Sequence, residues 1–166
     1  MKIAFLHTAQ IHVETFDALV AQFAPDAECT HVVAPDLLAQ AQTDGLGSVT
    51  EQTLQSLTEL TTADVVLCTC STLGPIADQL SKTHPNVLRV DRPMMEEACK
   101  TGSNIMVAIC LESTRAATLA LLKDCGATGA PHVVLCDNAW PFFEQGDTQG
   151  FAQAINAKIR DTIADA

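Results

Sequence analysis

Short apolar runs alternate with amphipathic stretches along the chain, and this alternation limits the possible folds more than any other feature. Residues 64–68 form a continuous run rich in apolar and β-branched residues, which is typical of a parallel strand buried on both faces. An earlier stretch has apolar side chains at helical spacing, namely Phe16, Leu19, Val20 and Phe23. Strands separated by helices in this way predict an α/β protein with a largely parallel sheet and right-handed crossovers.

The order of the expected elements follows from the same periodicities. Strands are expected over residues 3–6, 30–34, 64–68, 87–90, 105–110 and 132–136. Ser48 and Glu51 have the spacing of a capping box, which predicts that a helix begins there after a loop over residues 42–47. Thr148 is expected to cap the last helix, after Gly146 has closed the preceding element.

Composition bounds the class of protein. A length of 166 residues and a hydrophobic content of 48% fit one folded unit with a substantial core. The chain carries 20 acidic and 9 basic residues without a cluster of Lys or Arg, so nucleic acid and membrane are not expected partners. No apolar run approaches the ~18 residues that cross a bilayer, and no signal sequence precedes the first strand. The 7 cysteines are therefore expected to be free thiols of a cytoplasmic protein.

The turn over residues 68–75, Cys-Thr-Cys-Ser-Thr-Leu-Gly-Pro, is the most informative local feature. It follows a predicted strand, and Pro75 suits the first turn of the next helix. Cys70 thus lies at the carboxyl end of a strand, where parallel sheets bind ligands. The helix dipole favours a thiolate there, while Ser71, Thr72 and the nearby amides favour a carboxylate. Cys70 is predicted to be an acid/base beside an anion clamp, and the alternative is a buried packing residue.

The neighbouring candidates carry less chemistry. Cys68 lies inside the strand run and is expected to be a packing residue. The spacing from Cys68 to Cys70 fits neither paired zinc motifs nor a thioredoxin motif, so no metal site is expected. His7 and Thr8 end the first predicted strand and are candidate substrate contacts, or else they cap a turn.

An internal echo gives further candidates. The run Val-Val-Leu-Cys or a looser form of it occurs three times, at residues 65–68, 107–110 and 133–136. Cys110 and Cys136 therefore also end strands, and Glu112 takes the position that corresponds to Cys70. The echo is either a structural repeat or the chance similarity of short apolar strands.

Several motifs occur in an order that matters as much as their identity. They are Cys70-Ser71-Thr72, Asp91-Arg92-Pro93-Met94, Cys110 with Ser113-Thr114, Asn138-Ala139-Trp140 and Gly146-Asp147-Thr148. In this order they resemble the aspartate/glutamate racemase superfamily along nearly the whole chain. The resemblance implies no cofactor and one bilobed unit, with helices on both faces of a parallel sheet. The two similar lobes would span residues 1–95 and 96–166, the second being reduced.

The resemblance also implies roles for single residues. Cys70 corresponds to a thiol that exchanges the proton next to a substrate carboxylate. Contacts with a small carboxylate or amino-acid substrate are expected from the residues of the matching motifs: Ser71, Thr72, Asp91, Ser113, Thr114 and Asn138. The superfamily has a second cysteine in a strand and loop after the last helix, and this sequence, which ends at Ala166, has no residue there. Cys110, Cys136 and Glu112 are the candidates for the second acid/base.

The missing element would leave a sheet edge or an apolar face uncovered, so a homodimer is expected. Three functions stay open. The first is a cofactor-independent isomerase of the racemase or epimerase type, with Cys70 as its thiol acid/base. The second is a one-thiol decarboxylase or cis-trans isomerase of the same superfamily. The third is a non-catalytic protein that binds a small carboxylate. The missing second cysteine favours the one-thiol version, and an enzyme is expected over a binding protein.

Overall fold

The computed structural model describes residues 1–102 and 104–164. The chain divides into two compact units, Met1–Pro93 and Met94–Ala166. In the described residues, no helix is both long and apolar enough to cross a membrane.

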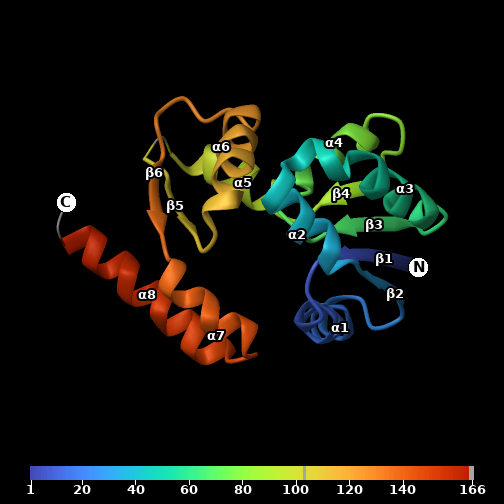
Figure 1. Cartoon of the computed structure of the whole chain (residues 1–166), viewed down its shortest axis with the longest axis horizontal. Helices are drawn as coiled ribbons and strands as arrows, with labels where there is room; N and C mark the ends of the chain where they lie inside the picture. Colours follow the sequence, from blue (N-terminus) through green and yellow to red (C-terminus); the bar gives the residue numbers. More distant parts are fainter. Residues whose placement is uncertain (103, 165–166) are drawn as a thin grey trace. The chain divides into compact units, whose positions relative to one another are not determined.

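The first unit is a four-stranded sheet in the order β2-β1-β3-β4, and every strand pair in it is parallel (Figure 1). Strands and helices alternate in sequence. Their bounds are β1 (Lys2–His7), α1 (Ile11–Phe23), β2 (Glu28–Val33), α2 (Pro35–Asp44), α3 (Thr50–Leu60), β3 (Val65–Cys68), α4 (Gly74–Ser81) and β4 (Val87–Arg89). The predicted α/β class with parallel strands is confirmed.

Side chains of β1 point alternately to the two faces of this sheet. Ala4 and Leu6 belong to the main core, which they share with buried residues of α2, α3 and α4. Phe5 and His7 point to the other face, where both rings contact Phe16 of α1. Helices therefore cover both faces of the sheet, as the continuous apolar runs of parallel strands require.

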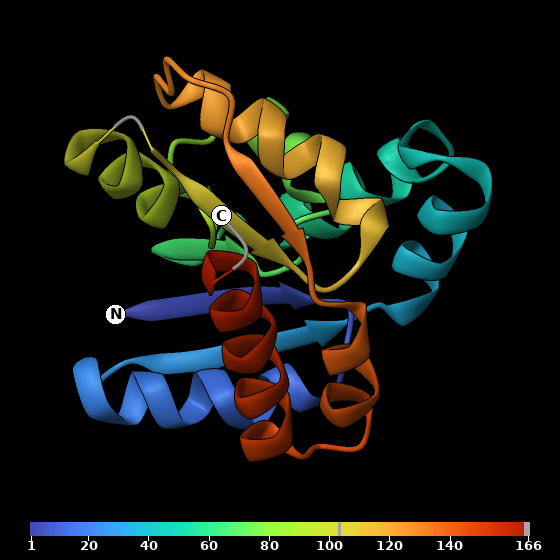
Figure 2. The ribbon, with the colours of Figure 1, turned by 90° about the vertical axis from the view of Figure 1, so that its left-hand side faces the viewer.

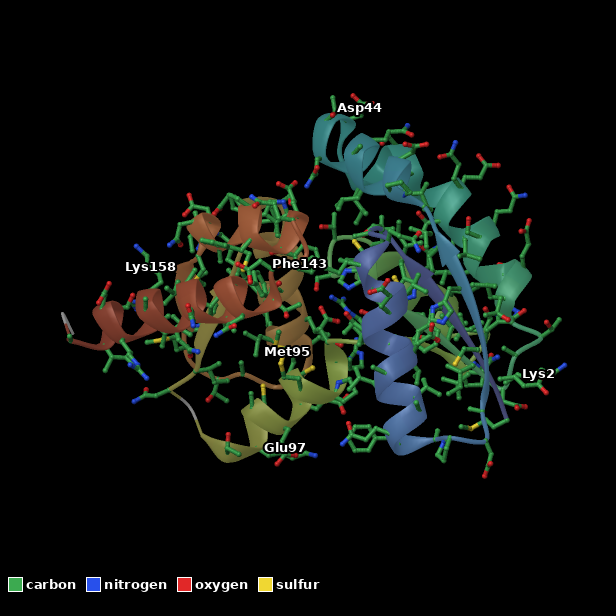
Figure 3. The ribbon with its side chains drawn as sticks, turned by 90° about the horizontal axis from the view of Figure 1, so that it is seen from below. Lys2, Asp44, Met95, Glu97, Phe143 and Lys158 are labelled. Carbon is green, nitrogen blue, oxygen red and sulfur yellow. The ribbon has the colours of Figure 1, made fainter. Side chains whose placement is uncertain are left out.

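The second unit holds a two-stranded parallel sheet, whose strands lie side by side in Figure 2. Its elements are α5 (Arg92–Thr101), which begins at the end of the first unit, β5 (Met106–Ile109), α6 (Arg115–Asp124), β6 (His132–Leu135), α7 (Trp140–Glu144) and α8 (Thr148–Ala164). Met95 of α5, labelled in Figure 3, packs with Val107, Ile109 and Leu121 into one core. A second cluster joins Cys136 to residues of α8.

Two predictions for the segment before α3 were wrong. Residues 42–44 continue α2 instead of forming a loop, and a 3-10 turn, Leu46–Val49, follows. The capping box does not form, because the Ser48 hydroxyl donates to Gly45 O at 2.8 Å and Val49 is the residue that precedes α3. Local bonding inside the 3-10 turn therefore displaces the cap.

The cap of α8 was assigned to the wrong residue. Thr148 is the first residue of the helix, and the side chain of Asp147 accepts a hydrogen bond from Gly150 N–H at 2.8 Å. Asp147 is therefore the N-cap, the position that aspartate prefers. Gly146 closes the preceding segment with a φ of 75°, as predicted, but the short helix α7 before it was not foreseen.

Candidate functional site

Backbone hydrogen bonds at the carboxyl edge of the first sheet fix the turn that follows β3. Thr69 N–H donates to Leu6 O at 3.0 Å, and Val90 N–H donates to Cys68 O at 3.0 Å. The turn is therefore held between the ends of β1 and β4. Cys70 lies two residues beyond the end of β3, at the edge where it was predicted.

Residues 69–73 form what we name the Cys70 turn, and they carry several unused hydrogen-bond donors. Within the described parts of the chain, the backbone N–H groups of Cys70, Ser71, Thr72 and Leu73 donate no hydrogen bond. The Thr72 hydroxyl is buried and likewise has no partner there. Cys70 itself is 8% exposed. Successive free amides and a hydroxyl are the donors that bind a carboxylate, so the turn offers an oxyanion site next to a thiol.

Cys68 behaves differently from Cys70. It is fully buried in the main core, and its thiol donates to Cys70 O, two residues further along the chain, at 3.7 Å. Burial, together with the proximity of Cys70, raises the pKa of Cys68 to about 12. The thiol therefore stays neutral, and the prediction of a packing residue is confirmed.

A buried ion-pair network fixes the other side of the turn. Arg89, at the end of β4, binds both oxygens of Asp91 at 2.7 and 2.9 Å and binds Asp78 of α4 at 2.8 Å. A Cβ at Gly74 would lie 2.4 Å from the Arg89 guanidinium carbon, so only glycine lets α4 begin against this group. Asp91 was predicted to contact the substrate, but both of its carboxylate oxygens accept hydrogen bonds from Arg89. Asp91 therefore helps to hold Arg89 at the carboxyl edge of the sheet.

His7 lies within a hydrogen-bonded chain that runs beneath the Cys70 turn. Its Nδ1 is 2.8 Å from Thr69 Oγ1, and its Nε2 is 2.8 Å from Nδ1 of His31 on β2. His31 Nε2 lies 3.0 Å from a carboxylate oxygen of Asp17 on α1. Burial, assisted by the nearby imidazoles of His31 and His12, lowers the pKa of His7 to about 4. His7 is therefore neutral at physiological pH and fully buried, while Thr8 beside it is 7% exposed.

The sequence-predicted thiols of the second unit end its two strands. Cys136 N–H donates to Ile109 O at 2.7 Å, which extends the pairing of β5 and β6 by one residue. Burial, together with Cys136, raises the pKa of Cys110 to about 11, and burial also raises the pKa of Cys136. Both thiols are therefore neutral near pH 7, a state in which they can donate a proton but not abstract one.

Glu112, Ser113 and Thr114 form a 3-10 turn that leads into α6. Glu112 is exposed and binds Arg115 through both of its oxygens, at 2.5 and 2.9 Å. Hydrogen bonding to Arg115 lowers the pKa of Glu112, which keeps it a carboxylate at neutral pH. The Thr114 hydroxyl donates to Leu111 O at 2.8 Å. Glu112 is consequently a charged surface residue that has no proton to deliver.

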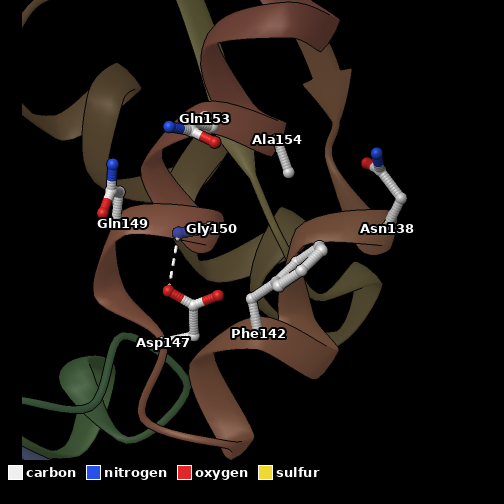
Figure 4. A pocket seen from close by; sticks show the side chains of 7 residues that line it. All are labelled: Asn138, Phe142, Asp147, Gln149, Gly150, Gln153 and Ala154. Carbon is white, nitrogen blue, oxygen red and sulfur yellow. Dashed lines mark hydrogen bonds between the residues drawn. The ribbon is translucent and has the colours of Figure 1, made fainter.

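Asn138, two residues after Cys136, is exposed. It lines an open hollow of about 540 Å³ on α7 and α8, which Figure 4 shows together with Phe142 and Asp147. The hydrogen bond from Gly150 to Asp147 forms part of its wall. No thiol lines this hollow among the described residues, so it supplies none of the predicted acid/base chemistry.

The predicted site residues thus fall into two sets in separate units. The first unit holds the residues of its carboxyl edge, which are His7, Thr8, Cys70, Ser71, Thr72 and Asp91; the second holds the strand-end and turn residues Cys110, Glu112, Ser113, Thr114, Cys136 and Asn138. Sequence reasoning missed Arg89, His31 and Asp17. The spacing of Cys29 and His31, two residues apart and therefore on one face of a strand, was the available signal for His31.

Comparisons of this chain with protein-family models, with curated proteins and with solved structures give no match. In the Cys70 turn of the first unit, a thiol lies beside unused hydrogen-bond donors that can bind an anion.

Proposed function

We propose that the Cys70 turn binds the carboxylate of a small substrate and that Cys70 exchanges the proton on the adjacent carbon. The activity would be that of a cofactor-independent isomerase of the racemase or epimerase type, in keeping with the resemblance to the aspartate/glutamate racemase superfamily. The two-lobe fold of that superfamily, with lobes over residues 1–95 and 96–166, is part of the same proposal.

One observation carries the proposal: one five-residue turn holds the Cys70 thiol together with four amides and a Thr72 hydroxyl that have no hydrogen-bond partner among the described residues. The C–H next to a carboxylate is less acidic than the C–H next to a neutral carboxyl group, so removing its proton has a high barrier. Fixed hydrogen-bond donors lower this barrier, because they stabilise the negative charge that develops on the carboxylate oxygens. The buried Arg89 network supports this role, since it holds the turn in place without offering a free guanidinium to the substrate.

The proton balance sets what else the reaction needs. Cys70 as a thiolate removes the proton from carbon and becomes a thiol, and inversion then requires a protonated acid to return a proton to the other face. Cys110 and Cys136 have raised pKa values and are therefore protonated, whereas Glu112 is held as a carboxylate. The two-thiol form of the proposal accordingly assigns the acid to one of these cysteines and not to Glu112.

A one-thiol reaction is the second candidate. It is favoured by the placement of Cys68, the nearest other thiol in sequence, which is fully buried and donates to Cys70 O, so that it offers the substrate no second acid/base. A decarboxylase or a cis-trans isomerase would use Cys70 alone, to protonate or to add to its substrate. The proposed carboxylate site is the same in both cases.

Proton exchange in deuterated water tests the proposal. The protein is incubated with a panel of L- and D-amino acids and small dicarboxylates, and loss of the proton next to the carboxylate is followed by NMR. We expect exchange in wild type, and a loss of at least ~100-fold in Cys70→Ser and Cys70→Ala, since a positioned acid/base contributes about that much. Cys29→Ser, which alters a half-buried thiol on β2, is the matched control and should retain the rate.

The stereochemistry separates the two forms. Exchange with inversion that Cys110→Ser or Cys136→Ser converts to exchange without inversion indicates the two-thiol reaction. Exchange or decarboxylation that depends on Cys70 alone indicates the one-thiol reaction. Full activity in both folded Cys70 variants would exclude an enzymatic role for this thiol. Ligand-induced stabilisation without turnover of any compound would instead support a binding protein.

A further inference from the structure

A cluster of potential metal ligands lies on the α1 face of the first sheet. Cys29 and His31 are two residues apart on β2, so their side chains point to the same face. Asp17 comes from α1, which covers that face. The Sγ, imidazole nitrogen and carboxylate oxygen of these three residues all lie within 4.8 Å of one another. We propose that Asp17, Cys29 and His31 bind a divalent ion of the zinc type.

The donor set selects this class of ion. A thiolate, an imidazole and a carboxylate are the three ligand types that zinc combines, with bond lengths of about 2.0–2.3 Å. Tetrahedral binding at those lengths separates the ligand atoms by about 3.3–3.6 Å. His31 Nε2 and Asp17 Oδ1 are already 3.0 Å apart. Small side-chain rotations therefore suffice to reach the geometry. Calcium and magnesium are disfavoured, because they prefer sites made only of oxygen.

The hydrogen-bonded chain behind His31 provides the support that a ligating histidine needs. The Thr69 hydroxyl lies 3.2 Å from Leu6 O as a donor, and it can accept from His7 Nδ1–H. His7 Nε2 then accepts from His31 Nδ1–H. In this arrangement each polar group has a partner, and the lone pair of His31 Nε2 faces the Asp17 carboxylate. Two acceptors at that distance require a cation between them, either a proton or a metal ion.

The opposite arrangement of protons is the metal-free alternative. Both imidazoles then carry their proton on Nε2, the Thr69 hydroxyl donates to His7, and His31 donates to Asp17. Each group holds the same number of protons in both arrangements, so metal binding changes the two tautomers while the contacts of His7 with Thr69 and with His31 are kept. The one net proton released comes from the Cys29 thiol as its sulfur binds the metal.

Packing fixes the ring that would bind the ion. His31 stacks on Phe5 with ring centroids 4.8 Å apart and planes 7° from parallel, and on His7 at 5.1 Å. The His31 side chain is only 13% exposed, whereas that of Asp17 is 55% exposed. The inner side of the site is thus rigid and the outer side open to solvent. Three protein ligands with a fourth position open to water is the coordination that zinc has in open, non-structural sites.

Metal titration of the full chain tests this inference. The protein is reduced, stripped with a chelator and titrated with Zn²⁺ by calorimetry in two buffers of different ionisation enthalpy. We expect one tightly bound ion per chain and about one proton released, because the Cys29 thiol must ionise. Replacing Zn²⁺ by Co²⁺ should give the thiolate-to-cobalt charge-transfer band and the visible bands of a tetrahedral site.

Variants identify the ligands. Cys29→Ser should abolish the charge-transfer band. His31→Gln and Asp17→Asn should weaken Zn²⁺ binding by at least ~100-fold, because loss of a ligand costs no less than loss of a residue that only supports one. Cys70→Ser is the matched control, and it should keep both the affinity and the band. Circular dichroism shows that each variant is folded. A band that persists in folded Cys29→Ser, or wild type that binds no Zn²⁺, would overturn the inference. Neither result bears on the proposed activity, which depends on Cys70.

Discussion

The partnerless hydroxyl of Thr72 gives the sharpest test of the Cys70 turn. Thr72 is 7% exposed, and its oxygen has no hydrogen-bond partner among the described residues. If the hydroxyl binds a ligand, it destabilises the free protein, where it has no hydrogen-bond partner, and stabilises the complex, where the ligand is its partner. Thr72→Val removes the hydroxyl and preserves the shape of the side chain. The substitution should therefore raise stability and lower affinity at the same time.

The magnitude of both effects follows from the burial. A buried hydroxyl without a partner costs about 1–3 kcal/mol, so Thr72→Val should raise the free energy of unfolding by at least ~1 kcal/mol. A hydrogen bond to a charged carboxylate contributes about 1.5–3 kcal/mol, which corresponds to a loss of ~10–100-fold in affinity. The two changes have opposite signs, a pattern that general damage to the fold does not produce.

Thr53 of α3 supplies the matched control. Its hydroxyl is the other buried side-chain group without a partner in the described parts of the chain, and the residue lies outside the Cys70 turn. Thr53→Val should stabilise the protein to a similar extent and leave ligand affinity unchanged. Urea denaturation measures the stability, and calorimetric titration with acetate, malonate and succinate measures the affinity. Thr72→Val that binds these carboxylates as tightly as wild type does would refute the anion clamp.

Two further predictions concern charge and ionisation. Arg89→Met leaves Asp91 buried without its partner, so it should lower the free energy of unfolding by ~3–5 kcal/mol. Arg92 lies at the half-buried end of the network, so Arg92→Met should lower the free energy of unfolding by ~1 kcal/mol or less. Urea denaturation measures both. Equal effects of the two variants would contradict the assigned network. The pKa of Cys110 is raised to about 11 by burial and by Cys136, so its neutral form stabilises the fold below the ordinary thiol pKa, and that contribution is lost as the pH rises towards 11. Alkylation of Cys110 by iodoacetamide at pH 8, followed by peptide mass spectrometry, should be ~100-fold slower than that of an ordinary thiol, and a rate profile with its midpoint near pH 9 would disprove the raised pKa.

The sheet could be predicted because its strands have a distinctive local sequence pattern. Residues 64–68 are apolar and β-branched whatever surrounds them, and β3 forms there. The end of α2 could not be predicted, since polar residues after Ala41 look like a loop until Leu37 and Ala41 are seen to be buried against the core. Helix formation in such a stretch is decided by tertiary packing, which local sequence does not carry.

The candidate sites divide along the same line. The Cys70 turn is contiguous in sequence, so its thiol and its donors could be proposed from the motif alone. The pairing of Arg89 with Asp78 and Asp91 could not be predicted, because the sequence indicates only that Arg89 belongs to a strand and not which side chains it meets. The Asp17, Cys29 and His31 cluster depends on the register that sets Phe5 opposite His31 and on the packing of α1. Sites assembled across elements need that register before they become visible.

Thr69 links the Cys70 turn to the proposed metal site and leads to a last prediction. Its N–H and its hydroxyl both contact Leu6 O, and the hydroxyl also contacts His7. Metal binding would reverse the direction of the hydroxyl proton, but both acceptors already lie within hydrogen-bond distance of the Thr69 oxygen. The Cys70 turn is therefore not expected to move when the metal binds.

The two sites should consequently act almost independently. Sites that share no moving part usually add within about 0.5 kcal/mol, so saturating Zn²⁺ should change the affinity for a bound carboxylate by ~2-fold or less. Calorimetric titration of malonate into the metal-free and the zinc-loaded protein measures this coupling. The combination of Cys29→Ser with Thr72→Val should likewise show additive losses for the two ligands. A coupling of tenfold or more would mean that the Thr69 oxygen moves with the proton, and the rigid chain proposed for His7 and His31 would be wrong.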